Sequence, residues 1–370
     1  MKKIIVVGAG VSGLAAAVRL QKLGYDVTLY EKEGQPGGKM NQIKENGFTF
    51  DVGPTIVMMP EIYREVFEFA GVDPNDYIPM EKVDPMLQLY FAQDEPLTFS
   101  NDLVELTKTL EAISEEDAQG YFAFLADIYK RYVIAKESFI TKSFRTWRDF
   151  YNPKSLWAGL KLRTFSDAYS SISKFVKDDR LRKSLAFQTL YIGVSPYQGP
   201  SLYTIIPMIE LMYGVYFIKG GMYTLATGMA RLFQELGGTI HYNTPIDELL
   251  IENKQTKGVR VNGETITADA VICAADFPYA MESLIPDESK RGKYTNQKIA
   301  SMDYSCSCFL LYLGLDKKYE DSALHSIYFA NDFKRNVDDL FEAGKLPEDP
   351  SFYLYRPTLK DASLAPDGQE

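Results

Sequence analysis

Hydrophobic positions at the start of the chain follow two successive patterns, which predict a strand, a helix and a second strand. Ile4–Val7 is an unbroken β-branched run, as in a parallel strand that is buried on both faces. Residues 14–23 are spaced as in a helix rich in small side chains, and Gly24 follows where such a helix would end. Residues 26–32 (DVTLYEK) predict the next strand. The pattern therefore predicts an α/β fold that begins with a β-α-β unit.

A glycine-rich turn separates this first strand from the helix. Gly8-Ala9-Gly10-Val11-Ser12-Gly13 matches G-x-G-x-x-G, in which Gly8 permits a tight turn and Gly13 allows close packing of helix on strand. Gly10 lets a pyrophosphate approach the backbone, and the free N–H groups around Ser12 attract phosphate. Glu31, 18 residues after Gly13, is placed to bind ribose hydroxyls and to repel a 2′-phosphate. The turn predicts a dinucleotide site; a chance glycine-rich turn is the alternative.

A second glycine-rich turn decides between FAD and NAD. Gly37-Gly38-Lys39-Met40 follows Glu31 directly, where a plain NAD domain would enter a crossover helix. Together with Gly47-Phe48 and Asp51-x-Gly53-Pro54, this turn resembles the flavin amine oxidase and carotenoid desaturase superfamily. Lys39 stands where that superfamily usually has Arg, which keeps the charge and loses the bidentate fork.

The resemblance implies FAD as the only redox cofactor. It also implies that a set of residues from both turns and one later position contacts FAD, the last through its backbone near the adenine: Gly8, Gly10, Ser12, Gly13, Glu31, Gly38, Lys39, Met40 and Ile246. No catalytic acid or base stands out. Asp149 and Glu210 are candidates only because acids are scarce around them.

Composition excludes several other functions. The net charge of −10 predicts no attraction to nucleic acid. Three cysteines give no disulfide framework and fit a reducing cytosol. Cys306-x-Cys308 lies in an apolar run that predicts the core of a strand in preference to a redox or metal pair. No His, Cys or carboxylate cluster has the spacing of metal ligands, so we predict no metal.

Residues 130–163 are basic within an acidic chain. This segment contains nine Lys or Arg residues and only two acids, Glu137 and Asp149. Both tryptophans, Trp147 and Trp157, lie in the same segment. Amphipathic aromatic residues among basic ones are typical of a helix in an anionic membrane interface. We therefore predict a cytoplasmic protein that is peripheral on the inner face of the cell membrane. A solvated basic face with core aromatics is the alternative. The basic residues are Lys130, Arg131, Lys136, Lys142, Arg145, Arg148, Lys154, Lys161 and Arg163.

Residues 184–218 carry a single charge, that of Glu210. The length would allow a membrane span, but glycines and prolines from Gly193 to Pro207 interrupt it, and lipid cannot satisfy a broken backbone. A buried wall rich in Tyr, Met and Ile, suited to a long, flat apolar ligand, is the better interpretation. Ordinary core packing is the alternative.

The patterns together predict that the chain is divided into three structural parts. Residues 305–315 and 351–357 are predicted strands of a second sheet that roofs the flavin. Members of the superfamily continue beyond the point where this sequence stops, so we expect the C-terminal parts of two domains to be absent. The parts are a Rossmann-like FAD-binding domain at 1–75 and 215–277, a mixed-sheet substrate domain at 76–110 and 278–370, and a helical, membrane-associating insertion at 111–214.

The stretch 187–223, with 47–63, 150–162 and 303–316, resembles bacterial carotenoid desaturases, nearest to those that act on C30 substrates. This resemblance implies FAD-dependent desaturation of a long apolar polyene, 4,4′-diapophytoene (dehydrosqualene), to diaponeurosporene-type products by hydride transfer to flavin. Four bulky residues would line or stop its tunnel: Tyr191, Tyr203, Tyr213 and Tyr216.

Three alternatives stay open at this point. The chain could be a C40 phytoene desaturase or related carotenoid oxidase. It could be another flavin oxidase of the superfamily, acting on an amine or a porphyrinogen. It could also be a non-catalytic fragment that binds an isoprenoid. The sequence indicates no oligomeric state.

Overall fold

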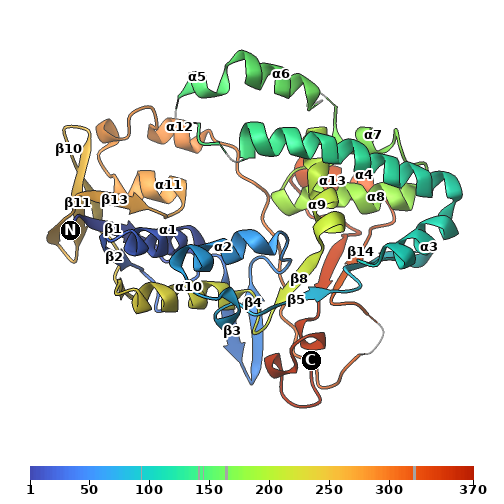
Figure 1. Cartoon of the computed structure of the whole chain (residues 1–370), viewed down its shortest axis with the longest axis horizontal. Helices are drawn as coiled ribbons and strands as arrows, with labels where there is room; N and C mark the ends of the chain where they lie inside the picture. Colours follow the sequence, from blue (N-terminus) through green and yellow to red (C-terminus); the bar gives the residue numbers. More distant parts are fainter. Residues whose placement is uncertain (93, 141, 145, 163–165, 320–321) are drawn as a thin grey trace.

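The computed structural model describes the whole chain except residues 93, 141, 145, 163–165 and 320–321. It has the mixed α/β fold that the sequence predicts, with a parallel sheet at one end and a mixed sheet covered by helices at the other (Figure 1).

The first sheet has four parallel strands in the order β13-β1-β2-β9. Four of the five residues of β1 are buried, which explains its unbroken β-branched run. The sheet combines strands from both ends of the first 273 residues, so the helical segment is inserted between them in sequence. The exact domain boundaries stay a prediction. The strands are β1 (Lys3–Val7), β2 (Asp26–Tyr30), β9 (Thr239–His241) and β13 (Ala270–Cys273).

Three helices pack together beside this sheet: α1 (Val11–Lys22), α2 (Pro60–Ala70) and α10 (Tyr223–Glu235). Ala17 of α1 is fully buried in the core that these helices share. Phe67 of α2 and Phe233 of α10 are also fully buried in the same core.

One three-stranded antiparallel sheet and two strand pairs also form among the described residues. The antiparallel sheet β10-β11-β12 contains a hairpin whose turn residues, Asn262 and Gly263, have φ of 50° and 80°. Positive φ at both positions is the requirement of a tight two-residue hairpin turn. The other pairs are β3 with β4 and β5 with β8. Their bounds are β3 (Asn41–Glu45), β4 (Phe48–Val52), β5 (Met80–Val83), β8 (Val215–Ile218), β10 (Glu248–Glu252), β11 (Gln255–Val261) and β12 (Glu264–Thr267).

The second sheet is mixed, in the order β15-β14-β6-β7. β14 (His325–Tyr328) is parallel to β6 (Leu87–Phe91) and antiparallel to β15 (Phe352–Tyr355), and β6 is antiparallel to β7 (Asp94–Phe99). The predicted strand at 351–357 is thus confirmed.

The prediction of a core strand at 305–315 is wrong. That segment forms no strand, Phe309 and Leu311 are 85% and 70% exposed, and Cys306 and Cys308 are exposed as well. Apolar and β-branched residues favour a strand only where another strand offers its backbone for pairing. Within the described ranges no strand pairs with this segment.

Helices cover the second sheet and share one large apolar core with it. The long helix α4 starts after Ser114, whose hydroxyl accepts a hydrogen bond from the Asp117 N–H at 3.0 Å. The helices of this region are α3 (Leu103–Ile113), α4 (Glu115–Ala135), η2 (Lys136–Ile140), α5 (Trp147–Phe150), α6 (Pro153–Lys161), α7 (Ala168–Ile172), α8 (Asp179–Ala186), η3 (Phe187–Ile192), η4 (Ser201–Thr204) and α9 (Ile205–Tyr213). Short helices elsewhere are η1 (Pro74–Asp76), α11 (Phe277–Tyr279), η5 (Ala280–Leu284), η6 (Glu288–Lys290), α12 (Asn296–Ala300), α13 (Phe333–Phe341), η7 (Pro357–Leu359) and η8 (Ala362–Leu364).

Candidate functional site

The two glycine-rich turns lie against each other at the carboxyl ends of β1 and β2. The Gly37 N–H donates to the Ala9 carbonyl at 2.8 Å, and Gly10 and Gly37 form an isolated parallel bridge. A Cβ added to Gly38 would lie 3.3 Å from the Gly10 Cα. The close contact between the two turns therefore depends on a glycine at position 38.

The first turn leaves open space where a pyrophosphate would lie. Gly8 has φ of +98°, and a Cβ on Gly13 would lie 2.0 Å from the Gly8 carbonyl oxygen, so both positions require glycine. A Cβ on Gly10 would meet nothing within 4 Å. No side chain caps the N-terminus of α1, and exposed Ser12 lies in its first turn. A negatively charged group fits here, because the dipole and free N–H groups of α1 point toward it.

Glu31 lies at the end of β2, buried beside this turn. Its Oε2 accepts a hydrogen bond from the Ala9 N–H at 2.6 Å, and its Oε1 accepts one from the Glu33 N–H at 2.9 Å. A carboxylate oxygen accepts more than one hydrogen bond, so both oxygens can also accept from ribose hydroxyls. These two bonds fix the orientation of the Glu31 side chain.

Three further predicted residues lie around these turns. The Thr244 N–H donates to the Glu31 carbonyl at 2.8 Å, which brings the segment that contains buried Ile246 beside Glu31. Met40 is buried, whereas the Lys39 side chain is 91% exposed and its Nζ lies 3.3 Å from Asp276 Oδ2. The structure thus brings all of the predicted cofactor residues to one edge of the parallel sheet, and the arrangement fits a dinucleotide.

Asp51 has a structural role that the sequence did not indicate. Its carboxylate accepts hydrogen bonds from the Met222 and Tyr223 N–H groups, at 2.8 and 3.3 Å, and so caps the start of α10. Gly221 must be glycine at this point, because a Cβ there would lie 2.5 Å from Asp51 Oδ2. Asp51 therefore ties the hairpin β3–β4 to the helix beside the first sheet.

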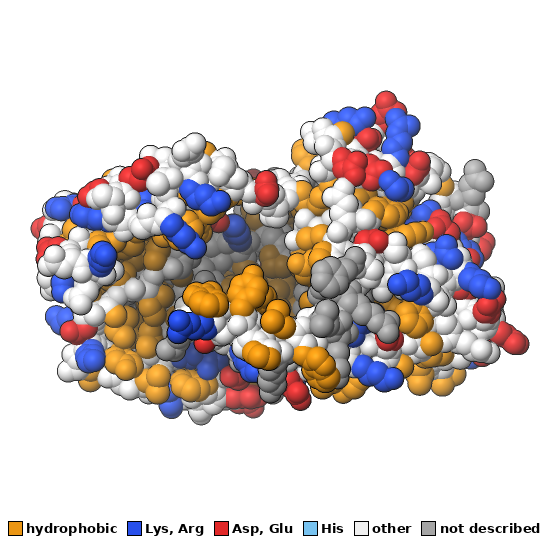
Figure 2. Space-filling model, turned by 90° about the horizontal axis from the view of Figure 1, so that it is seen from above, with side chains coloured by type: hydrophobic (Ala, Val, Ile, Leu, Met, Phe, Trp, Pro, Cys, Tyr) orange, Lys and Arg blue, Asp and Glu red, His pale blue; other side chains and the backbone are white. Residues whose placement is uncertain are grey.

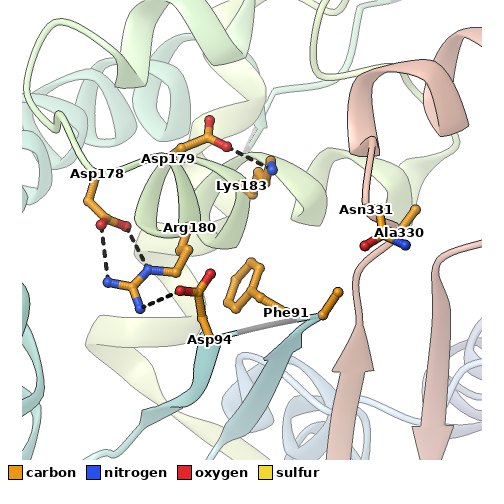
Figure 3. Close-up of a pocket in the computed structure, with 9 residues that line it drawn as sticks. Phe91, Asp94, Asp178, Asp179, Arg180, Lys183, Ala330 and Asn331 are labelled. Carbon is orange, nitrogen blue, oxygen red and sulfur yellow. Dashed lines mark hydrogen bonds and ion pairs between the residues drawn. The ribbon is translucent and has the colours of Figure 1, made fainter.

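One surface pocket, with a volume of about 390 Å³, lies between α8 and the second sheet (Figure 3). Its charged residues are paired with one another: Arg180 lies 3.2 Å from Asp178 and 3.9 Å from Asp94, and Lys183 lies 2.7 Å from Asp179. Such a surface does not suit a hydrocarbon, which binds by burial of apolar area. We therefore do not assign the polyene to this pocket.

The two acids that the sequence singled out occupy different environments. Asp149 accepts hydrogen bonds from the N–H and hydroxyl of Thr146 and so forms the capping box of α5. Glu210 is fully buried on α9, and burial raises its pKa to about 8. The raised pKa of Glu210 is of the kind that is typical of functional sites.

The four tyrosines predicted to line a tunnel lie in four different elements. Tyr191 is in η3, Tyr203 in η4, Tyr213 at the end of α9 and Tyr216 in β8, and all are partly buried. Tyr191 packs edge-on against Phe187, with ring centroids 5.7 Å apart. Their role as tunnel residues stays a prediction.

Sequence reasoning also missed a group of polar side chains near Glu210. They are contributed by η3, β14, β15 and the loop after β4: Gln188, His325, Tyr353 and Thr55. The only available sequence signal was the isolation of Glu210 as the one charge in 184–218.

Comparisons with known proteins agree with this geometry. The model of the family described as flavin containing amine oxidoreductase matches residues 11–343. The chain is 48% identical over 369 residues to a 4,4′-diapophytoene desaturase (4,4′-diaponeurosporene-forming) of Staphylococcus haemolyticus, covering 99% of this chain and 74% of that protein. It is 47% identical over 370 residues to the enzyme of the same name from Staphylococcus aureus, again covering 99% and 74%.

A solved structure supports the fold. An oxidoreductase from Methanosarcina mazei superposes with a TM-score of 0.62 at 17% identity, over 99% of this chain and 77% of the other. The family match and the two relatives place the chain more closely than this distant likeness does. The chain therefore belongs to the flavin containing amine oxidoreductase family, in the group that includes the staphylococcal 4,4′-diapophytoene desaturases, and it is an FAD-dependent oxidoreductase.

Proposed function

We propose that this protein desaturates the C30 polyene 4,4′-diapophytoene to diaponeurosporene-type products, with FAD as the oxidant. The observation that carries the proposal is the 48% identity over 99% of the chain to a desaturase with this named product. A bound flavin supplies the acceptor for the hydride that desaturation removes. The amine oxidase, porphyrinogen oxidase and isoprenoid-binding alternatives have no comparable support.

The residues at the edge of the parallel sheet are proposed to hold the FAD. The pyrophosphate would lie over Gly10 at the N-terminus of α1, and Glu31 would accept from the ribose hydroxyls. The second turn, at Gly38–Met40, closes over the first, and Lys39 supplies a positive charge at its exposed end. The backbone at Ile246 would lie near the adenine, because its segment runs beside Glu31.

The protein is also proposed to dock on an anionic membrane through α5 and α6. Trp147 and Trp157 are 69% and 60% exposed, and Figure 1 places both helices at the outer edge of the molecule. Figure 2 views this side, where hydrophobic and basic side chains gather next to a hollow in the surface. Such a surface suits insertion of aromatic rings among lipid headgroups. The inner face of the cell membrane, in the cytoplasm, remains the proposed location.

Among the described basic residues of the predicted segment, Arg131 is not available for docking. Arg131 is buried and pairs with Asp127 at 2.8 Å, because it lies on the inner face of α4. Arg145 and Arg163 lie outside the described residues, as do the side chains of Lys154 and Lys161. None of the helices in the described ranges combines the length and apolar content that a membrane span requires.

The test is a side-by-side conversion of 4,4′-diapophytoene and C40 phytoene in anionic liposomes, with FAD supplied and products separated by chromatography. We expect the C30 polyene to be converted and phytoene to react more slowly. Equal rates would contradict the C30 assignment, and failure with both would contradict the desaturase proposal itself.

A further inference from the structure

Glu210 is the centre of a buried polar cluster in an otherwise apolar region. Its side chain is fully buried, and its Oε2 accepts a hydrogen bond from Gln188 Nε2 at 2.9 Å. Its Oε1 has no hydrogen-bond partner in the part of the chain that the structure describes, and neither does Gln188 Oε1. A buried acid oxygen without a hydrogen-bond partner costs free energy, and such atoms in native proteins often have a catalytic role.

Several tyrosines face this carboxyl group from different elements. Tyr121 from α4 and Tyr191 from η3 are among them, and their hydroxyls also lack partners within the described residues. Burial raises the pKa of Tyr121, Tyr191 and Tyr353, and the nearby charge of Glu210 raises each further. No Lys, Arg or His forms an ion pair with Glu210 among the residues described. The neutral acid is therefore favoured below the raised pKa of Glu210, and the carboxylate forms above it.

A chain of hydrogen bonds leads from β14 toward the candidate cofactor site. The Tyr353 hydroxyl lies 2.7 Å from His325 Nδ1 and 2.7 Å from Thr55 Oγ1. Thr55 lies two residues after Gly53, and a Cβ on Gly53 would lie 2.3 Å from the Lys39 carbonyl oxygen. The charge of Glu210 raises the pKa of Tyr353. The Tyr353 hydroxyl also bonds to Thr55, in the loop that lies against the second glycine-rich turn. The cluster is thus adjacent to the segment that carries the cofactor residues.

Desaturation has to dispose of two hydrogens in different ways. One C–H bond breaks with its electron pair, and that hydrogen leaves as hydride. The neighbouring C–H bond then breaks, its electron pair forms the new double bond, and its hydrogen leaves as a proton. A hydrocarbon has no group of its own to receive that proton, so the protein or a water molecule must do so.

We propose that Glu210 is the proton acceptor of the desaturation, with its free Oε1 receiving the proton that leaves the polyene and Gln188 positioning the carboxylate through Oε2. This inference rests on the proposed function, which supplies the polyene and the FAD that takes the hydride. Burial makes the Glu210 carboxylate a stronger base than an exposed one, because its pKa rises to about 8.

The first measurement needs neither cofactor nor substrate. Infrared spectra of the protein, recorded from acid to alkaline pH, should show a protonated carboxylic acid band that disappears with a midpoint near pH 8. The band should be absent in Glu210→Gln, which preserves the side-chain volume. It should persist in the control Glu264→Gln, at an exposed position of β12. No such band in the wild-type protein would overturn the inference.

The second measurement is the rate of 4,4′-diapophytoene oxidation against pH. Below the pKa of Glu210, the wild-type rate should rise about tenfold per pH unit, because only the carboxylate accepts a proton. Glu210→Gln should react roughly 100-fold or more slowly and lose this slope, whereas Glu264→Gln should keep both rate and slope. An unchanged rate and slope in Glu210→Gln would overturn the inference. A wild-type protein that is inactive at every pH would overturn the proposed function, and the infrared titration would still decide the protonation of Glu210.

Discussion

The carboxylate of Glu31 accepts a hydrogen bond from the backbone N–H of Ala9 at 2.6 Å, across 22 residues of sequence. This bond joins the end of β2 to the turn that follows β1. It holds the glycine-rich turn and the proposed ribose-binding acid together in one unit. Binding then requires little further ordering of either element.

Glu31→Ala should weaken FAD retention by about 1–3 kcal/mol, because the ribose hydroxyls lose their acceptor. The control is Glu33→Ala, since the Glu33 side chain is exposed and only its backbone contacts Glu31. Flavin content after extensive dialysis is the measurement. Equal flavin content in the Glu31 variant and the wild type would argue against the assignment of this acid.

Arg148→Gln should reduce binding to anionic vesicles by about 1 kcal/mol, the usual contribution of one basic residue near such a surface. Trp147→Ala should reduce binding to neutral and anionic vesicles alike, because the indole inserts whatever the headgroup charge. Lys257→Gln, on β11, serves as the charge-matched control. Vesicle sedimentation at low and high salt would test both effects. Binding that is unchanged by lipid charge and by salt concentration would exclude the electrostatic contribution.

Tyr191→Ala should relax the discrimination between C30 and C40 polyenes before it abolishes turnover. Extra methylenes discriminate weakly by themselves, so length selectivity has to come from a bulky stop in the tunnel. Tyr191→Phe keeps the ring and should keep the selectivity. The ratio of the two conversion rates is the measurement, and an unchanged ratio in the alanine variant would remove Tyr191 from the tunnel.

Glu210→Gln should stabilise the protein increasingly as the pH rises from about 4.5 to about 8. The pKa of Glu210 is raised in the folded state, so the wild type loses stability across that window, where the unfolded chain releases the proton first. The difference between variant and wild type should reach at most about 5 kcal/mol. Thermal unfolding against pH would measure it, and parallel curves for the two proteins would contradict the raised pKa.

His325 should limit stability on the acid side. Burial lowers the pKa of His325 to about 3, so stability is retained above pH 6.5 and lost as the pH falls toward 3. His325→Phe should flatten this acid dependence while retaining a ring to stack on Tyr355, whose centroid lies 5.3 Å from that of His325. An equally steep acid transition in the variant would place the sensitivity elsewhere.

Local patterns made the first sheet and its turns predictable. The β-branched run of β1, the G-x-G-x-x-G turn and the Asn262-Gly263 hairpin each depend on residues close together in sequence, so their physical requirements are visible there. Glu31 was predictable as well, because the length of one helix fixes its distance from the turn.

The remaining features depend on partners far apart in sequence. Residues 305–315 have strand-like composition, but a strand also needs a neighbour, which composition does not reveal. The cluster around Glu210 draws on α9, η3, β14, β15 and the loop at Thr55, so no local motif contains it. Glu210 stood out in sequence only by its isolation.

The most direct test of the proposed function is anaerobic addition of 4,4′-diapophytoene, in anionic liposomes, to the FAD-loaded protein. We expect the yellow flavin absorbance to bleach in proportion to the polyene converted, while new conjugated absorbance appears from the product. The absorbance should return when air is admitted. Flavin that stays oxidised while the polyene is bound and unchanged would contradict the assignment of this protein as a desaturase.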